Sequence, residues 1–329
     1  MTTYKQAILS GMELRKHYQT KPGPGSETGL LTALDGTNLD LYKGETLGIA
    51  GESGCGKSTL GKILSGLLMP DKGKVLYNGT SIGQLSPLAS ITFRRQTQMI
   101  FQDPFSSLNP RMQVGEIISE PLVIAGTGSA ASRRSAVQSL MSKVGLSSDL
   151  YNRFPHEFSG GQRQRIGIAR ALASAPTIII ADEPVSSLDI SIQAQIINLL
   201  QSMKAEFQLS MIIISHDLSV LRHICDRILI MYLGIIVESA EAADLFKHCQ
   251  HPYTEALISA IPKIGQGKKE KGPILKDDLP SPLVIPPGCR FHPRCRYAEE
   301  ICRQQIPPLE EKKSGHMAAC HFSKSIFGE

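Results

Sequence analysis

Residues 158–189 read FSGGQRQRIGIARALASAPTIIIADEPVSSLD, and this stretch decides the fold class. A Ser-Gly-Gly-Gln turn leads into a basic, alanine-rich helical pattern, which is followed by an apolar run that ends in Asp182 and Glu183. A glycine turn before a helix presents backbone N–H groups to an anion. An apolar strand that ends in acids delivers carboxylates to the sheet edge where α/β folds bind ligands. The stretch therefore predicts an α/β protein that acts on nucleotide phosphates.

A second motif lies upstream, where residues 51–58 read GESGCGKS and fit the phosphate-loop pattern G-x-x-x-x-G-K-[ST]. An apolar segment at 46–50 precedes it and a helical pattern at 57–68 follows it. In such a loop, glycines let backbone amides surround the phosphates, Lys57 reaches the β and γ groups, and the Ser58 hydroxyl can bind Mg²⁺. A chance glycine-rich turn would not come with this strand, this helix and the acidic strand downstream.

Together these motifs make the chain resemble the ATP-binding subunits of ABC transporters, most closely the dipeptide and oligopeptide importer ATPases. The resemblance implies an α/β fold with an ABC-type P-loop NTPase core, in which helices pack on a RecA-like mixed sheet. It also implies an inserted helical subdomain, a small Cys-rich C-terminal module, ATP and Mg²⁺ as cofactors, and ATP hydrolysis coupled to peptide translocation.

The same resemblance assigns roles to single residues. Glu183 is the expected general base, Asp182 holds Mg²⁺ through water, and His216, in ISHD, is the switch histidine that contacts the γ-phosphate. Gln102, in IFQDP, senses Mg²⁺ and the γ-phosphate, and Tyr18 stacks on adenine. The predicted catalytic set is Glu183, His216 and Gln102, the magnesium set is Ser58, Gln102 and Asp182, and the ATP-binding set is Tyr18, Gly51, Ser53, Gly54, Cys55, Gly56, Lys57, Ser58, Thr59, Gln102, Ser159, Gly160, Gly161, Gln162, Asp182 and Asp189.

A single histidine or glutamine is more often structural than catalytic. His216 and Gln102 are exceptions because each follows an apolar run, at 211–214 and 99–101 respectively, and should therefore lie at the sheet edge. The signature begins with Phe158 where leucine is commoner, and Ser187 replaces the usual alanine. Neither change removes a catalytic group, so we expect a hydrolysing subunit.

The loop chemistry also predicts a reactive thiol. Cys55 lies between two glycines beside Lys57, and surroundings that favour anions lower a thiol pKa. We therefore expect alkylation of Cys55 to inactivate the protein and MgATP to protect it.

Composition excludes several classes of protein. The 329 residues are 41% hydrophobic and 20% charged with a net charge of +5, which is ordinary for a globular protein. No basic stripe with interleaved aromatics suggests nucleic-acid binding. No apolar run approaches the ~20 residues that span a bilayer, and the N-terminus does not resemble a secretory signal. We expect a peripheral protein that other subunits hold at the cytoplasmic face of the inner membrane.

The predicted organisation has two parts. Residues 1–262 form the nucleotide-binding domain, with a core sheet from 1–110 and 175–245 and an inserted helical subdomain at about 111–173, including a helix at 129–144. Residues 263–329 form a linker and a Cys-rich extension. A single phosphate loop without a coiled-coil insertion argues against the chromosome-organising, DNA-repair and translation-factor ATPases of this superfamily.

The C-terminal region carries two further signals. Residues 251–257, HPYTEAL, resemble a segment typical of peptide and nickel importer ATPases, and four of the seven cysteines gather near the end of the chain. Such clustering in a cytosolic chain indicates a metal site rather than disulfides, although the spacing fits neither a zinc ribbon nor a ferredoxin. By chemistry alone four thiolates suit Fe–S or Zn²⁺ equally, and nearby His292, His316 and His321 keep zinc open as an alternative. The resemblance implies a [4Fe–4S] cluster held by Cys289, Cys295, Cys302 and Cys320, and unliganded thiols are the third alternative. So short a segment has little apolar surface of its own, so a metal would supply the missing cross-links.

The resemblance implies several partners. Two ATPase subunits sandwich two ATP molecules head to tail, so the Ser159–Gly160–Gly161–Gln162 signature of one subunit closes over the nucleotide of the other, with Asp189 at the interface. The partner ATPase is expected to be a paralogue, joined by two transmembrane permease subunits and a substrate-binding protein. Residues 103–112 are expected to receive a coupling helix. The alternatives are the same role for nickel, glutathione or antimicrobial peptides, and a soluble ABC ATPase with a regulatory or assembly role.

Overall fold

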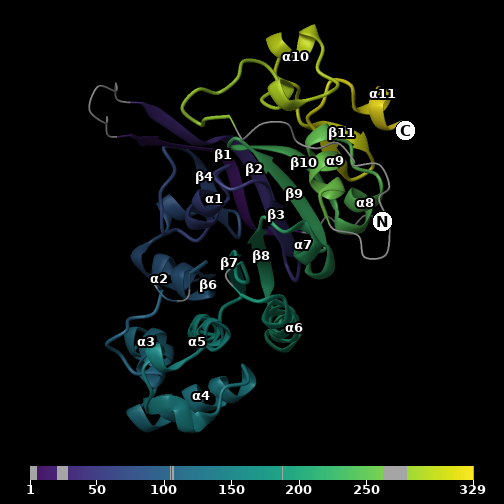
Figure 1. The fold of residues 1–329 in the computed structure, drawn as a ribbon. Coiled ribbons are helices and arrows are strands. Elements are labelled where there is room, and N and C mark those ends of the chain that lie inside the picture. Colours follow the sequence, from purple (N-terminus) through teal and green to yellow (C-terminus); the bar gives the residue numbers. More distant parts are fainter. Residues whose placement is uncertain are drawn as a thin grey trace, which may run out of the picture.

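The computed structural model describes residues 6–20, 29–103, 105, 107–186, 188–261 and 280–328 (Figure 1). Two sheets organise these residues: a four-stranded sheet in the order β2-β1-β4-β5 and an eight-stranded sheet in the order β11-β12-β10-β9-β3-β8-β7-β6. The strands are β1 (Ala7–Gln19), β2 (Leu30–Tyr42), β3 (Thr46–Ala50), β4 (Lys72–Tyr77), β5 (Thr80–Ser81), β6 (Thr97–Ile100), β7 (Ile178–Asp182), β8 (Ser210–Ser215), β9 (Arg227–Tyr232), β10 (Ile235–Glu241), β11 (Glu310–Lys313) and β12 (His316–Ala318).

The helices connect and cover these strands. The α-helices are α1 (Lys57–Leu64), α2 (Pro87–Gln96), α3 (Val114–Ile124), α4 (Ala130–Lys143), α5 (Gly160–Ala173), α6 (Ile190–Phe207), α7 (Leu218–Ile224), α8 (Ala242–Lys247), α9 (Pro252–Ser259), α10 (Glu300–Gln304) and α11 (Ser323–Phe327). Four short 3₁₀ turns are η1 (Ile82–Gln84), η2 (Ser148–Asn152), η3 (Pro155–Glu157) and η4 (His292–Arg294). Among the described residues no helix is long and apolar enough to cross a membrane.

The centre of the larger sheet is parallel. Strands β3, β7 and β8 are apolar runs in which every residue is buried, as expected for strands covered on both faces. β8 pairs in parallel with β3 on one side and β7 on the other, and β6 continues the parallel set next to β7. The loops after these strands therefore meet at one edge of the sheet, as the sequence predicted.

The N-terminal strands depart from the expected core sheet. β1 and β2, of 13 residues each, pair antiparallel, and with β4 and β5 they form a separate sheet. Leu9, Leu34 and Val75 of this sheet join Ile49 of β3 in one buried cluster. Burial on only one face explains why these strands mix buried and exposed positions and pack as a second layer.

Three helices gather at one end of the molecule (Figure 1). α3 packs against both α4 and α5, and Ile118, Val137 and Ile166 are buried in the same cluster. α4 matches the helix predicted at 129–144, and the hydroxyl of Ser129 caps it by accepting from the N–H of Ser132.

The C-terminal segment adds two strands to one end of the eight-stranded sheet. β12 pairs antiparallel with β10, opposing Ala318 to Glu238, and β11 pairs with β12 at the edge. Phe291 is buried in the main core cluster. The segment, which has little apolar surface of its own, therefore buries what it has against the preceding domain (yellow in Figure 1).

Candidate active site

The phosphate-loop sequence forms the turn between β3 and α1. Gly51, Gly54 and Gly56 have positive φ angles of 153°, 84° and 109°. A Cβ atom on Gly56 would lie 2.2 Å from the Ala33 carbonyl oxygen, and one on Gly51 would lie 2.2 Å from that of Met231. Only glycine fits at these two positions, so the loop wraps tightly at the N-terminus of α1.

Lys57 is folded back over this loop. Its Nζ donates to the carbonyl oxygens of Gly51 at 2.7 Å and Glu52 at 2.9 Å, and the residue is almost fully buried. These bonds keep a positive charge beside backbone amides at a helix N-terminus, which is the chemistry of an anion site.

Asp182 lies opposite α1 at the end of β7. The Ser58 hydroxyl donates to its Oδ1 at 3.0 Å. Burial raises the pKa of Asp182, the Ser58 hydrogen bond opposes that rise, and the neighbouring Glu183 adds to it. A hydroxyl and a buried carboxylate in contact are oxygen donors of the kind that Mg²⁺ prefers.

Glu183 connects two other sheet-edge residues. Gln102 Nε2 donates to Glu183 Oε2 at 3.1 Å, and His216 Nδ1 lies 3.2 Å from Glu183 Oε1. Glu183 also has a positive φ of 45°, an uncommon conformation for a residue with a side chain, and its N–H donates to the carbonyl of Ile214. Such strain is often stored where a side chain must be aimed at a reaction. The structure thus brings together all three residues that the sequence predicted to be catalytic.

Tyr18 lies near the same loop. Its hydroxyl is 3.4 Å from the Thr59 hydroxyl, and its ring is partly exposed on β1. This places an aromatic face beside α1, while its role in stacking on adenine stays a prediction.

The signature turn lies elsewhere on the chain. Ser159 caps α5 in a reciprocal box with Gln162, and the backbones of Gly160 and Gly161 approach Leu188 and Ile192. Asp189 precedes α6 beside them. In the described part of the chain no hydrogen bond joins this turn to residues 51–58.

The predicted low pKa of the Cys55 thiol is wrong. Its side chain is 1% exposed, and burial raises the pKa of the thiol even though Lys57, with its Nζ 3.9 Å from Sγ, opposes the rise. The side chain packs in the buried cluster with Leu60 and Ile49. Only the backbone of Cys55 can therefore contact a phosphate held by the loop. Burial raises the free energy of the charged thiolate by more than the nearby Lys57 ammonium lowers it.

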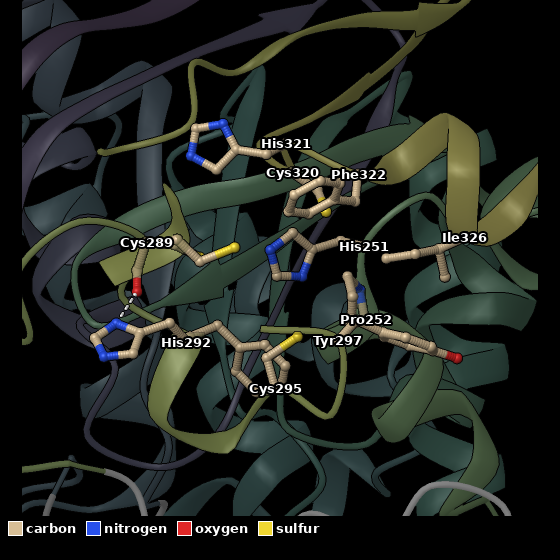
Figure 2. A pocket seen from close by; sticks show the side chains of 12 residues that line it. His251, Pro252, Cys289, His292, Cys295, Tyr297, Cys320, His321, Phe322 and Ile326 are labelled. Atoms are coloured by element: carbon tan, nitrogen blue, oxygen red, sulfur yellow. Dashed lines mark hydrogen bonds between the residues drawn. The ribbon is translucent and has the colours of Figure 1, made fainter. Parts of the chain in front are cut away.

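The four C-terminal cysteines line one small cavity of about 20 Å³ together with His251, His292 and His321. In Figure 2 the sulfurs of Cys289, Cys295 and Cys320 point toward the same space around His251. Cys289 N–H also donates to the Cys302 carbonyl at 2.8 Å. Burial raises the pKa of Cys289 to about 11 and that of Cys295 to about 12.

The cavity fits the donor set of a metal centre but is small. It is about the size of a single water or ion. Within the described residues no group of three or more His, Cys, Asp or Glu already has the arrangement of a metal site. The [4Fe–4S] cluster and its zinc alternative therefore stay predictions.

His316, predicted as a nearby zinc donor, points elsewhere. Its Nε2 lies 2.7 Å from Glu238 and its Nδ1 lies 2.9 Å from Asp244. Both ring nitrogens are occupied by carboxylates of the nucleotide domain, so His316 anchors β12.

Comparison with known proteins agrees with this geometry. Residues 34–186 match the family described as ABC transporter, and residues 237–302 match the oligopeptide/dipeptide transporter C-terminal region. The chain is 46% identical to the dipeptide transport ATP-binding protein DppF of Escherichia coli, over 97% of the chain and 95% of that protein. It is 47% identical to the oligopeptide transport ATP-binding protein AppF of Bacillus subtilis, over 97% of the chain and 98% of that protein.

The chain belongs to the ABC transporter ATPases. Solved structures of such ATPases share its fold. A dimeric post-hydrolysis state of the ATP-binding cassette MJ0796 bound to ADP and Pi aligns with a TM-score of 0.63 at 29% identity, covering 71% of this chain and 99% of that one. CbiO1 from Clostridium perfringens aligns with a TM-score of 0.63 at 28% identity, covering 74% and 92%.

This ABC ATPase also has contacts that sequence reasoning missed. Arg294, beside Cys295, forms a two-bonded ion pair with Glu52 of the phosphate loop. The Tyr253 hydroxyl accepts from the Glu52 N–H at 2.9 Å. No sequence signal joins these residues, because about 200 or more positions separate each pair and only the tertiary fold brings them together.

Proposed function

We propose that this ABC ATPase hydrolyses ATP to energise import of dipeptides or oligopeptides through a transporter at the cytoplasmic face of the inner membrane. Both named relatives are peptide-transport ATP-binding proteins, which favours peptides over nickel, glutathione or antimicrobial peptides. The expected partners are two permease subunits, a substrate-binding protein and a paralogous ATPase.

One observation carries the hydrolytic assignment: Glu183 lies in contact with both Gln102 and His216 at the sheet edge that holds the phosphate loop. Glu183 would orient the attacking water and accept its proton, while Gln102 and His216 would align it on the γ-phosphate. Lys57 and the amides of residues 51–58 would bind the phosphates, and Ser58 with Asp182 would hold Mg²⁺.

The signature turn supports a head-to-tail dimer. Ser159, Gly160 and Gly161 begin α5, an α-helix of 14 residues, and therefore present N–H groups to an anion. In the proposed dimer, the phosphate bound by this turn would belong to the ATP held by the phosphate loop of the opposite subunit. Asp189 would lie at that interface, beside the exposed Ile190.

A cleft beside Gln102 would receive the coupling helix of a permease. Its volume is about 560 Å³, and its walls come from the end of α1, from β6 and from α3 and α5. Its lining combines the charged Arg94, Glu120 and Arg170 with the apolar Leu67, Met99 and Phe101. A mixed apolar and charged lining suits an amphipathic helix. The expected contact segment, 103–112, borders this cleft through Ser107, and Pro104 and Ser106 lie outside the described residues.

We retain the two-part organisation as a proposal: a nucleotide-binding domain at 1–262 with a helical subdomain at 111–173, and a linker with a Cys-rich module at 263–329. Packing of α3 on α4 and α5 supports the helical subdomain. Most of the proposed linker, residues 262–279, lies outside the described residues.

For the Cys-rich module we propose a thiolate-bound metal centre held by Cys289, Cys295, Cys302 and Cys320. A [4Fe–4S] cluster is our assignment, with Zn²⁺ as the alternative, and the support is the convergence of four thiols on one cavity. The centre would cross-link turns that have no covalent connection. Metal analysis of anaerobically purified protein decides the identity, since about four irons per chain support the cluster and stoichiometric zinc without iron contradicts it.

Reconstitution tests the transport function. The chain, its paralogue, two permeases and the binding protein, assembled in vesicles, should hydrolyse ATP faster when a dipeptide-loaded binding protein is added. The Glu183→Gln variant provides the matched control, because it should bind ATP without this stimulation. Stimulation by nickel or glutathione but by no peptide would contradict the proposed substrate.

A further inference from the structure

An ion pair joins the cysteine-rich segment to the phosphate loop. Arg294 Nη1 lies 2.6 Å from Glu52 Oε2, and Nη2 lies 3.0 Å from Oε1, so the guanidinium and carboxylate meet as a two-bonded fork. The Arg294 side chain is 3% exposed and that of Glu52 is 26% exposed. A sheltered fork of this kind is among the stronger charge-assisted contacts in proteins and holds a fixed geometry.

Glu52 is held at every polar group that it has. Its carboxylate binds Arg294, its N–H donates to the Tyr253 hydroxyl, and its carbonyl accepts from Lys57 Nζ at 2.9 Å. It is the second residue of the loop, directly after Gly51, whose carbonyl accepts the other Lys57 bond. The position of Glu52 therefore helps set where the amides and the lysine of the loop lie.

Arg294 is in turn held by the cysteine turn. It ends η4 (His292–Arg294), and Cys289 and Cys295 lie on either side of this turn. The N–H of Arg294 donates to the Phe291 carbonyl at 3.0 Å, and the Phe291 ring packs at 5.4 Å from the ring of Tyr253. Two contacts thus run from one turn to one loop residue: Arg294 directly, and Phe291 through Tyr253. Figure 2 shows Cys289, His292 and Cys295 together on this side of the cavity.

We propose that Arg294 is a positioning residue for ATP binding, which aligns the phosphate loop by holding Glu52 and ties that alignment to the state of the cysteine turn. The inference rests on the proposed binding of phosphates by residues 51–58. Arg294 touches no reacting atom, so it acts on how well the loop fits ATP rather than on the chemistry of Glu183.

The energetic consequence follows from the fork. Replacing Arg294 removes both bonds, so the Glu52 side chain loses the partner that fixes it and the loop no longer has one preferred arrangement. We expect Arg294→Gln to weaken MgATP binding roughly tenfold, which is about 1.4 kcal/mol. Arg294→Lys retains the charge but loses the fork, so its affinity should be intermediate.

The coupling must also run in reverse. If the cysteine turn stabilises the arrangement of the loop that binds ATP, then bound ATP stabilises the matching arrangement of the turn by the same free energy. MgATP should therefore slow hydrogen exchange of the backbone amides at residues 289–297 in the parent protein. In Arg294→Gln this slowing should be lost, although ATP still binds at saturating concentration.

The experiment measures MgATP affinity by calorimetry on the full-length chain, with thermal unfolding recorded for each variant. The variants are Arg294→Gln, Arg294→Lys, Glu52→Gln and the Arg294→Gln/Glu52→Gln double variant. Arg296→Gln is the matched control, since Arg296 also pairs with a glutamate, Glu255, but half of its side chain is exposed and it does not touch the loop. Glu52→Gln leaves the C-terminal sequence unchanged and so keeps the test valid if Arg294→Gln fails to fold.

Two results together support the proposal. Arg294→Gln and Glu52→Gln each weaken MgATP binding, and the double variant binds MgATP no more weakly than the single variant with the lower affinity. Parent-like affinity in Arg294→Gln overturns it, as does an equal loss in Arg296→Gln. Additive losses in the double variant also overturn it, because independent effects exclude coupling through the pair.

Lys57→Ala separates this inference from the assignment of the loop. If Lys57→Ala binds MgATP as tightly as the parent, residues 51–58 do not bind the phosphates and the proposed function itself fails. If Lys57→Ala loses binding while Arg294→Gln retains it, only the positioning role is wrong.

Discussion

His216 Nδ1 lies 3.2 Å from Glu183 Oε1, although the two residues directly follow different strands of the sheet. β7 and β8 are neighbouring parallel strands, so residues that follow them meet at the same edge. With Gln102 bonded to the other carboxylate oxygen, Glu183 is fixed from two sides. A base held in one orientation can align a water without reorganising during the reaction.

Glu183→Gln should abolish turnover and preserve ATP binding. The amide cannot accept the proton of the attacking water, while Asp182 and Ser58 still provide the magnesium contacts. Steady-state hydrolysis should fall by about 100-fold or more, and ATP-dependent dimerisation should become easier to detect by gel filtration. The assay needs both composite sites accounted for, because an intact partner site can hide the loss. Hydrolysis at the parent rate would contradict the assignment of Glu183 as the general base.

Gln102→Ala and His216→Ala should lower kcat with smaller effects on ATP affinity. Each variant removes one of the two contacts that orient Glu183, so we expect losses of about 10- to 100-fold in kcat. Gln201→Ala is a suitable control, because Gln201 lies on α6 and its side chain donates to the His223 carbonyl instead. A change in KM alone would show that these residues bind nucleotide without aligning the base.

Cys55 should resist alkylation in the folded chain. Its thiol is buried and burial raises its pKa, so little thiolate is exposed at neutral pH. With iodoacetamide at pH 7.5, mass spectrometry should detect modification of Cys55 only under denaturing conditions. Cys55→Ala should bind ATP like the parent and lose about 1 kcal/mol of unfolding free energy from the smaller buried side chain. Fast labelling that MgATP suppresses would contradict this placement of the side chain.

Docking of the hairpin formed by β11 and β12 against β10 should weaken as pH rises. Burial opposes protonation of His316, but the hydrogen bonds that its ring donates to Glu238 and Asp244 outweigh burial and raise the pKa of His316. Burial also raises the pKa of Glu238, whereas the hydrogen bond to His316 lowers that of Asp244. A group whose pKa is raised on folding, such as His316 or Glu238, stabilises the folded state at low pH, and this stabilisation is lost as the pH rises through the folded-state pKa. A group whose pKa is lowered, such as Asp244, contributes stability that is lost only in strong acid. Docking should therefore be tightest at about pH 4–6.5 and weaker toward pH 9.

Hydrogen exchange at residues 310–320 checks this pH dependence, after correction for the intrinsic rate at each pH. His316→Gln should flatten the profile, because a neutral amide cannot titrate between the two carboxylates. His248→Gln is the control, since His248 also pairs with Asp244 but lies on the surface. Equal protection of the parent hairpin at pH 6 and pH 9 would show that His316 does not anchor it through its charge.

The sequence alone predicted the catalytic edge because its signals are local. Residues 51–58 combine glycines, a lysine and a helix start in one short run, and Asp182 and Glu183 directly follow a buried strand. His216 and Gln102 could be added because carboxyl ends of parallel strands meet at one edge, whatever loops separate them. These expectations need only strand direction, which the apolar runs indicate.

Only the tertiary structure decided the contacts that depend on distant pairing and burial. That β1 and β2 form a separate sheet, and that β12 extends the larger one, depends on which strands pair, and local patterns do not specify pairing. The pKa of Cys55 rises because neighbours from other elements exclude water, outweighing the lysine two positions away. Arg294 meets Glu52 across 242 residues for the same reason. Packing of the cysteine turn against the core buries the Arg294 guanidinium, and a buried charge needs a partner.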